Sequence, residues 1–302
     1  MPTSNKFSRF AWGVLIYDLA VILWGAWVRI TGSGAGCGDH WPTCGGEVIP
    51  RSPSTETLIE FSHRLTSGVT LILAIILVVF AMKHFRPGHP SRRASVITLL
   101  FILLEAALGA LLVIKGLVAK DTSIARAIVT SLHLANTLGL VAFGALTAWH
   151  ARPHNPSWGS APSARWTQLV ILGLIAVGMT GAITALGDTL FPVPIAADTS
   201  LWAQISSDLT ATDHFLIRLR IVHPIVSVIV ATITLMWANA IKTKARAGVI
   251  SQLSALVIAV VLIQVLVGVF NIMLHAPGWI QLCHLLIANI LWISVVLTAS
   301  EA

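Results

Sequence analysis

Four histidines lie inside apolar segments, where a polar ring needs a partner. They are His63, His133, His223 and His284. Each is about six to nine residues from the expected outer end of its segment, which at 1.5 Å per residue is roughly 10 Å below the membrane surface. A single intramembrane histidine often serves only as a hydrogen bond between helices. Four at one depth predict a binding site.

Paired imidazoles inside a helical bundle are suited to haem. One histidine can bind the iron from each side while the apolar wall of the bundle covers the porphyrin. A closed zinc site instead requires four ligands of the cysteine, histidine or carboxylate type, and the cysteines that would complete one lie elsewhere. The sequence therefore predicts two haem sites with iron as the metal, one holding His63 and His133 and the other His223 and His284.

The elements that position these histidines are membrane-spanning helices. Of the 302 residues, 56% are hydrophobic and 10% are charged, against about 25% charged residues in soluble domains. A helix needs about 20 apolar residues to cross the hydrocarbon core. Eight segments qualify, at 11–30, 57–82, 95–115, 126–149, 166–187, 215–240, 250–274 and 279–298. The predicted fold class is an all-α integral membrane protein with eight transmembrane helices.

Charge in the connecting segments predicts the orientation. Alternate segments are basic, with Lys6, Arg9, Lys83, Arg86, Arg92, Arg93, Arg152, Arg165, Lys242, Lys244 and Arg246. The others are acidic, with Asp39, Glu47, Glu56, Asp121, Asp188, Asp198, Asp208 and Asp213. Since cytoplasmic loops carry the excess of Lys and Arg, both termini are expected in the cytoplasm. Such clusters explain the net charge of +7 without a nucleic-acid partner. No transit segment is visible, which favours a bacterial plasma membrane.

The chain divides into two related halves. A Pro-, Ser- and Gly-rich stretch at 150–165 separates four helices from four, so the predicted units are 1–150 and 151–302. GAWVRITGSG near Gly25 aligns with GMTGAITALG near Gly178, and LGALLV near Gly109 resembles VGVFNI near Gly268. This similarity predicts an internal duplication that forms two related four-helix bundles.

The two halves differ beside their first histidine. Glu60 precedes His63 by three residues and shares its helix face. At the offset that matches His63 with His223, the counterpart of Glu60 is Arg220. A carboxylate near a porphyrin edge can accept a proton or stabilise a cationic intermediate, whereas a guanidinium suits a haem propionate. Two alternatives remain: Thr57 and Glu60 match the capping-box spacing, and Arg220 fits a snorkelling interfacial charge.

Other reactive side chains lie in the first outer loop and inside the helices. Six residues separate Cys37 from Cys44, and the outer side is oxidising, so we expect a disulfide. This disulfide would be either a static staple or a redox-active pair. Cys283 is expected to be a small core residue. Asp18 and Glu105 are intramembrane acids to which the sequence assigns no partner.

Together these motifs resemble one family. GAWVRITGSGAGCGDHWPTCGG, EFSHR and the single histidines of helices 4, 6 and 8 resemble haem A synthase, in the bacterial form that carries a cysteine pair. The resemblance spans the whole chain. One departure is His40, where the family usually has Asp, although Asp39 directly precedes it.

The resemblance implies that haem O is the substrate. Its C8 methyl would be hydroxylated twice, and the geminal diol would lose water to give the formyl group of haem A. The resemblance further implies that His63 and His133 flank the substrate haem, that His223 and His284 ligate a haem b cofactor, and that Glu60 is catalytically essential. Contacts with haem O synthase, an electron acceptor, membrane lipid and a second copy of the chain are consistent with this role.

Two rival functions use the same residues. A di-haem electron-transfer cytochrome, working between quinol and an outer acceptor, would need the four histidines but not Glu60 or the cysteine pair. A thiol oxidase that uses a quinone would need Cys37 and Cys44 but would leave the histidines unexplained.

Overall fold

The chain is helical throughout the part that the structure describes. The computed structural model describes residues 2–152, 164–192, 214–245 and 248–302. These ranges hold eight helices long and apolar enough to cross a membrane, and no strand beyond an isolated bridge between Cys44 and Glu47. The predicted all-α membrane fold is confirmed. The acids Asp198, Asp208 and Asp213, together with Arg246, lie outside the described residues.

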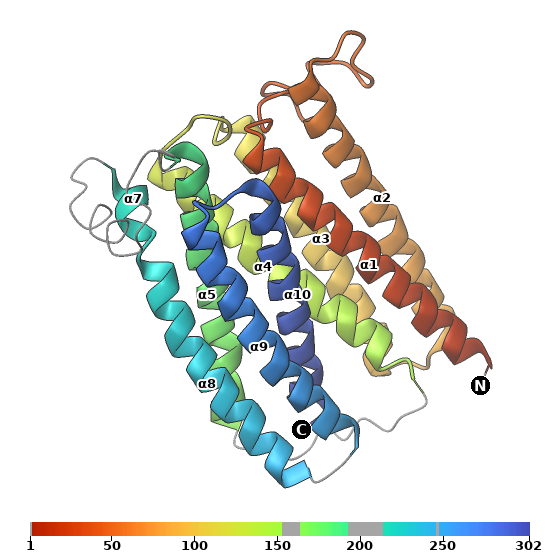
Figure 1. Cartoon of the computed structure of the whole chain (residues 1–302). Coiled ribbons are helices and arrows are strands. Elements are labelled where there is room, and N and C mark those ends of the chain that lie inside the picture. Colours follow the sequence, from red (N-terminus) through yellow and green to blue (C-terminus); the bar gives the residue numbers. More distant parts are fainter. Residues whose placement is uncertain (1, 153–163, 193–213, 246–247) are drawn as a thin grey trace. The chain divides into compact units, whose positions relative to one another are not determined.

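The first compact unit, Met1–Asn155, is a four-helix bundle (Figure 1). Its helices are α1 (Pro2–Ile30), α2 (Thr55–His84), α3 (Pro90–Ile114) and α4 (Ile124–Trp149). Contacts run from α1 to α2, from α2 to α3, from α3 to α4 and from α4 back to α1. This cyclic order places α2 across the bundle from α4. Phe7 and Ala11 of α1 pack with Leu77 and Ala81 of α2 in the core at the end of the bundle away from the histidines.

The second unit, Pro156–Ala302, repeats this arrangement. It contains α5 (Ala164–Leu190), α7 (Phe215–Leu219), α8 (Val222–Ala245), α9 (Val249–Met273) and α10 (Gly278–Glu301). Contacts connect α5 with α8, α8 with α9, α9 with α10 and α10 with α5, so α8 lies across from α10. Trp237 is 1% exposed and belongs to the hydrophobic core of this unit, where it donates its indole N–H to the hydroxyl of Thr167.

One expected helix is broken. The segment 215–240 was predicted to be continuous, but α7 ends at Leu219 and α8 begins at Val222. Pro224 explains the break, because its ring would clash with the carbonyl of the residue four positions earlier, Arg220. The break lies directly before His223, which is therefore in the first turn of α8.

Polar residues in the loops set where the helices of the first unit begin. Ser54 and Ser123 accept backbone N–H groups at the starts of α2 and α4. At α3, the Nδ1 atom of His89 accepts from Ser91 N, and Pro90 occupies the first turn. Burial lowers the pKa of His89, which favours the neutral ring that can accept this bond.

The membrane orientation remains a prediction. We expect alkaline phosphatase fused after Asp121 to be active, because this enzyme folds only outside the cytoplasm, and the same reporter fused after Arg165 to be inactive. Equal activity at both positions, or the opposite order, would contradict the assignment of both termini to the cytoplasm.

Candidate functional site

The four histidines lie on helices that face each other across their own bundles. His63 is on α2 and His133 on α4, while His223 is on α8 and His284 on α10. They follow the first residues of their spans, Thr55, Ile124, Phe215 and Gly278, by eight, nine, eight and six positions. This corresponds to roughly 9 to 14 Å along the helix axis. Each bundle therefore holds two imidazoles at similar depth on opposite helices.

Glycines on neighbouring helices make room for three of these rings. A Cβ atom added at Gly25 would lie 2.9 Å from Cε1 of His63, and one at Gly181 would lie 3.0 Å from Cε1 of His223. At Gly268 the corresponding distance to His284 is 3.2 Å. Any larger residue would push the ring away. Gly25 and Gly181 each lie against the first histidine of their bundle and are therefore structural counterparts. The sequence alignment had instead matched Gly25 with Gly178, three residues earlier.

In the second unit, the spacing of the two rings fits one iron atom between them. The ring centres of His223 and His284 are 6.5 Å apart and the ring planes are nearly perpendicular, at 87°. A metal–imidazole bond of about 2 Å, with roughly 1.1 Å from ring nitrogen to ring centre, would place two axial rings about 6.3 Å apart. The described residues contain no cluster of three or more His, Cys, Asp or Glu side chains that could hold a metal ion, as zinc would require.

Neutral side chains contact both of these rings. Nδ1 of His223 is 3.3 Å from the hydroxyl of Thr180 and 3.5 Å from that of Ser227. Nε2 of His284 is 3.1 Å from the side-chain nitrogen of Gln264. An iron bound at Nε2 of His284 would therefore replace this last contact.

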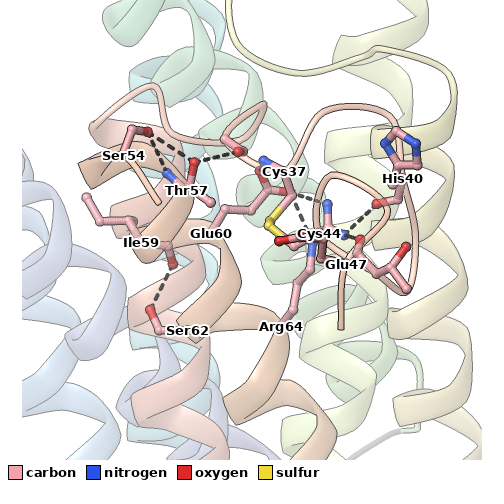
Figure 2. The surroundings of a disulfide bond; sticks show 12 residues. Cys37, His40, Cys44, Glu47, Ser54, Thr57, Ile59, Glu60, Ser62 and Arg64 are labelled. Carbon is pink, nitrogen blue, oxygen red and sulfur yellow. Dashed lines mark hydrogen bonds and ion pairs between the residues drawn. A yellow bond between two sulfur atoms is a disulfide. The ribbon is translucent and has the colours of Figure 1, made fainter. Parts of the chain in front are cut away.

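Glu60 connects its helix to the disulfide loop (Figure 2). The side chain is buried, at 3% exposed, and Oε2 accepts the backbone N–H of Cys37 at 2.8 Å. Oε1 pairs with the guanidinium of Arg64 one turn further along α2. The N-cap of α2 is Ser54, not Thr57. The capping-box alternative for Glu60 is therefore wrong, because its carboxylate is directed at the loop and at Arg64.

The loop between α1 and α2 is held on α2 by several bonds. Cys37 and Cys44 form the expected disulfide. Inside the ring that it closes, Arg64 donates to the carbonyls of His40 at 2.6 Å and Thr43 at 2.7 Å. The hydroxyl of Thr57 donates to Gly36 O at 2.8 Å. The buried Glu60 and the partly buried Arg64 thus form an ion pair next to the disulfide, as Figure 2 shows.

Arg220 has a comparable place with the opposite charge. Its Nε is 3.1 Å from Asp188 Oδ1, and the guanidinium donates to the carbonyls of Gly187 and Phe191. With 8% exposure, Arg220 does not snorkel at the surface. Arg220 connects the segment before α8 to the end of α5. A haem propionate, the partner predicted from the sequence, would therefore compete with Asp188 and the two carbonyls for this guanidinium.

The sequence missed the environment of Glu105. This residue of α3 has three neighbours on α4: His133, Asn136 and Thr137. One signal was present, because the offset that relates Gly109 to Gly268 also relates Glu105 to Gln264. Nothing in the structure assigns a role to Asp18, which is 2% exposed.

Cys283 is exposed, which contradicts its predicted place in the core. The physical reason is its position directly before His284. Successive residues of a helix point about 100° apart, so the inward direction of the His284 ring turns Cys283 away from the bundle interior.

Removing the disulfide should loosen the loop measurably. The ring of eight residues is short, so its closure is worth roughly 2 kcal/mol, or about 30-fold in a local opening equilibrium. We expect a Cys37→Ser/Cys44→Ser variant to exchange the backbone amide hydrogen at position 37 about 10- to 100-fold faster than the wild-type protein. Mass spectrometry of peptides spanning 31–54 measures this rate, and α3 peptides serve as the control. Unchanged exchange would mean that Glu60 and Arg64 hold the loop alone.

Comparison with known proteins identifies the family of the chain. Residues 8–296 match the family of cytochrome oxidase assembly proteins, COX15-CtaA. The chain belongs to this family. The resemblance to haem A synthases is confirmed at that level, since a Bacillus mycoides protein named Heme A synthase is 42% identical over 98 residues, 32% of each chain.

A longer relative covers the whole chain. A Thermus thermophilus protein named Protoheme IX farnesyltransferase is 42% identical over 306 aligned residues, covering 100% of this chain and 49% of its own length. The protein of the same name from a second Thermus thermophilus strain has the same identity and coverage. The chain therefore spans about half the length of these relatives.

Proposed function

We propose that the protein oxidises the C8 methyl of haem O to a formyl group and so produces haem A. The observation that carries the proposal is a pair of imidazoles on opposite helices of each bundle, with carboxylates, among the described residues, next to the histidines of the first bundle only. Glu60 precedes His63 by three residues on α2, and Oε1 of Glu105 is 3.3 Å from Nδ1 of His133. His223 contacts the hydroxyls of Thr180 and Ser227, and His284 contacts the amide of Gln264.

The half that contains Glu60 and Glu105 suits the substrate haem. Conversion of a methyl to a formyl group, CH₃ + H₂O → CHO + 4 H⁺ + 4 e⁻, removes four electrons and four protons in two hydroxylations and one dehydration. Positive charge develops at the carbon and the macrocycle as electrons leave. A fixed carboxylate in a low-dielectric site stabilises that charge better than water does. The electrons pass to an acceptor outside the chain.

The second half suits a resident haem b. His223 and His284 would hold its iron, with Gly181 and Gly268 leaving room for the rings. Such a haem supplies one-electron redox chemistry when bound.

The relatives support haem O as the substrate. Half of the Thermus protein aligns with this chain, and that protein is named for attaching farnesyl to protohaem. A farnesylated protohaem is the compound that a haem A-forming enzyme would consume. We therefore propose haem O synthase as a partner in the membrane.

The test is conversion of haem O by the purified protein in bacterial lipid, followed by chromatography of the extracted haems. Appearance of formyl haem, dependent on an added electron acceptor, supports the proposal. A protein that makes none and transfers electrons from quinol to an outer acceptor would be the di-haem cytochrome instead.

A further inference from the structure

Glu105 gathers three groups of α4 around one carboxylate. Oε1 is 3.3 Å from Nδ1 of His133 and accepts the hydroxyl of Thr137. Oε2 accepts the side-chain amide of Asn136, whose nitrogen also donates to Phe101 O at 2.9 Å. Glu105 is 22% exposed and His133 is 28% exposed. Among the described residues, Nδ1 of His133 has no other partner.

The other half has an amide at the same position. The repeat that relates Gly109 to Gly268 relates Glu105 to Gln264. Gln264 also touches the second histidine of its bundle, with its side-chain nitrogen 3.1 Å from Nε2 of His284. One position on the third helix therefore contacts the second histidine in both halves, as a carboxylate in the first and as a neutral amide in the second.

These two partners act differently on an imidazole that binds iron. A carboxylate at Nδ1 favours the tautomer with hydrogen on Nδ1, which leaves the lone pair of Nε2 for the metal. Such a bond also raises the basicity of the ligand. A more basic axial ligand stabilises the ferric state and lowers the reduction potential. Gln264 instead contacts Nε2 of His284, the nitrogen that iron would occupy, and among the described residues Nδ1 of His284 makes no hydrogen bond.

We propose that Glu105 is a positioning residue that fixes the tautomer of His133 and lowers the reduction potential of the haem bound there. Gln264 leaves the haem at His284 without this effect. The inference rests on the proposed function only in taking His133 as an axial ligand of the substrate haem. Neither Thr137 nor Asn136 would contact iron; both hold the carboxylate in place.

The experiment compares Glu105→Gln, Glu105→Asp and Gln264→Ala in the full chain loaded with haem O and haem b. Anaerobic potentiometric titration, followed by absorbance, gives the midpoint of each haem, and His133→Ala and His284→Ala identify which signal belongs to which site. In Glu105→Gln we expect the ferric-to-ferrous ratio of the His133 haem to fall at least tenfold at fixed potential. This is a rise of 59 mV or more for one electron. Gln264→Ala should leave that midpoint unchanged.

Glu105→Asp distinguishes the effect of the negative charge from the effect of side-chain length. It retains the carboxylate and should keep more of the low potential than Glu105→Gln. A second measurement needs no haem: ¹⁵N-histidine spectra of the wild-type protein before loading should show His133 with hydrogen on Nδ1.

Three outcomes would overturn the inference: an unchanged midpoint in Glu105→Gln, an equal shift in Glu105→Asp, or hydrogen on Nε2 of His133 in the haem-free protein. Failure of the proposed function is distinguishable, because it would show as the absence of formyl haem from the wild-type protein, whereas the midpoint and the tautomer are measured without turnover.

Discussion

Glu60→Gln is expected to slow haem O conversion by a factor of 10² to 10⁴, the range typical of general acid–base catalysis. Glutamine keeps an oxygen for the Cys37 N–H bond but loses the negative charge that we assign to transition-state stabilisation. Arg64 retains its bonds to the carbonyls of His40 and Thr43, so the loop should stay attached to α2.

The measurement is the amount of formyl haem formed per unit time, with haem b content determined on the same sample. Thr57→Val is the matched control, because it removes a different bond between α2 and the loop, at Gly36 O, and leaves the carboxylate untouched. Loss of turnover in Glu60→Gln but not in Thr57→Val assigns the effect to charge. Near wild-type turnover in Glu60→Gln would eliminate the catalytic role, and equal losses in both variants would make Glu60 a loop anchor only.

His223→Ala and His284→Ala are each expected to abolish the low-spin bis-imidazole spectrum of the resting protein. Each ring would supply one of two axial bonds to an iron held between rings 6.5 Å apart, so removal of either ring leaves one imidazole of the pair. The readout is the visible and electron paramagnetic resonance spectrum of protein purified without added haem O.

His63→Ala serves as the control for this prediction, because it lies in the other unit and should leave the haem b spectrum intact. Full retention of the spectrum in both His223→Ala and His284→Ala would show that the cofactor assignment to the second bundle is wrong. Conversion to a high-spin spectrum with haem still bound would be consistent with loss of one axial ligand.

Both predictions concern residues that the sequence could identify. Apolar length and charge asymmetry are local properties, and each transmembrane helix satisfies its own backbone hydrogen bonds. The eight spans therefore followed from composition, and the depths of His63, His133, His223 and His284 followed from counting along each span. The contrast between Glu60 and Arg220 followed from the duplication, and the disulfide followed from the spacing of the cysteines and the expected side of the membrane.

Contacts between helices were decided only by the tertiary structure. Glu60 matched a capping motif, but Ser54 caps α2, and the carboxylate binds Cys37 and Arg64 because the loop folds back over the helix. Glu105 meets His133 because α3 and α4 pack side by side, and their register depends on many side chains at once. Pro224 was visible in the sequence, but whether it would kink or break the helix depended on how α7 packs against α5. Spacing along one helix shows which residues share a face, whereas the partner of that face depends on packing against another helix, which no single segment encodes.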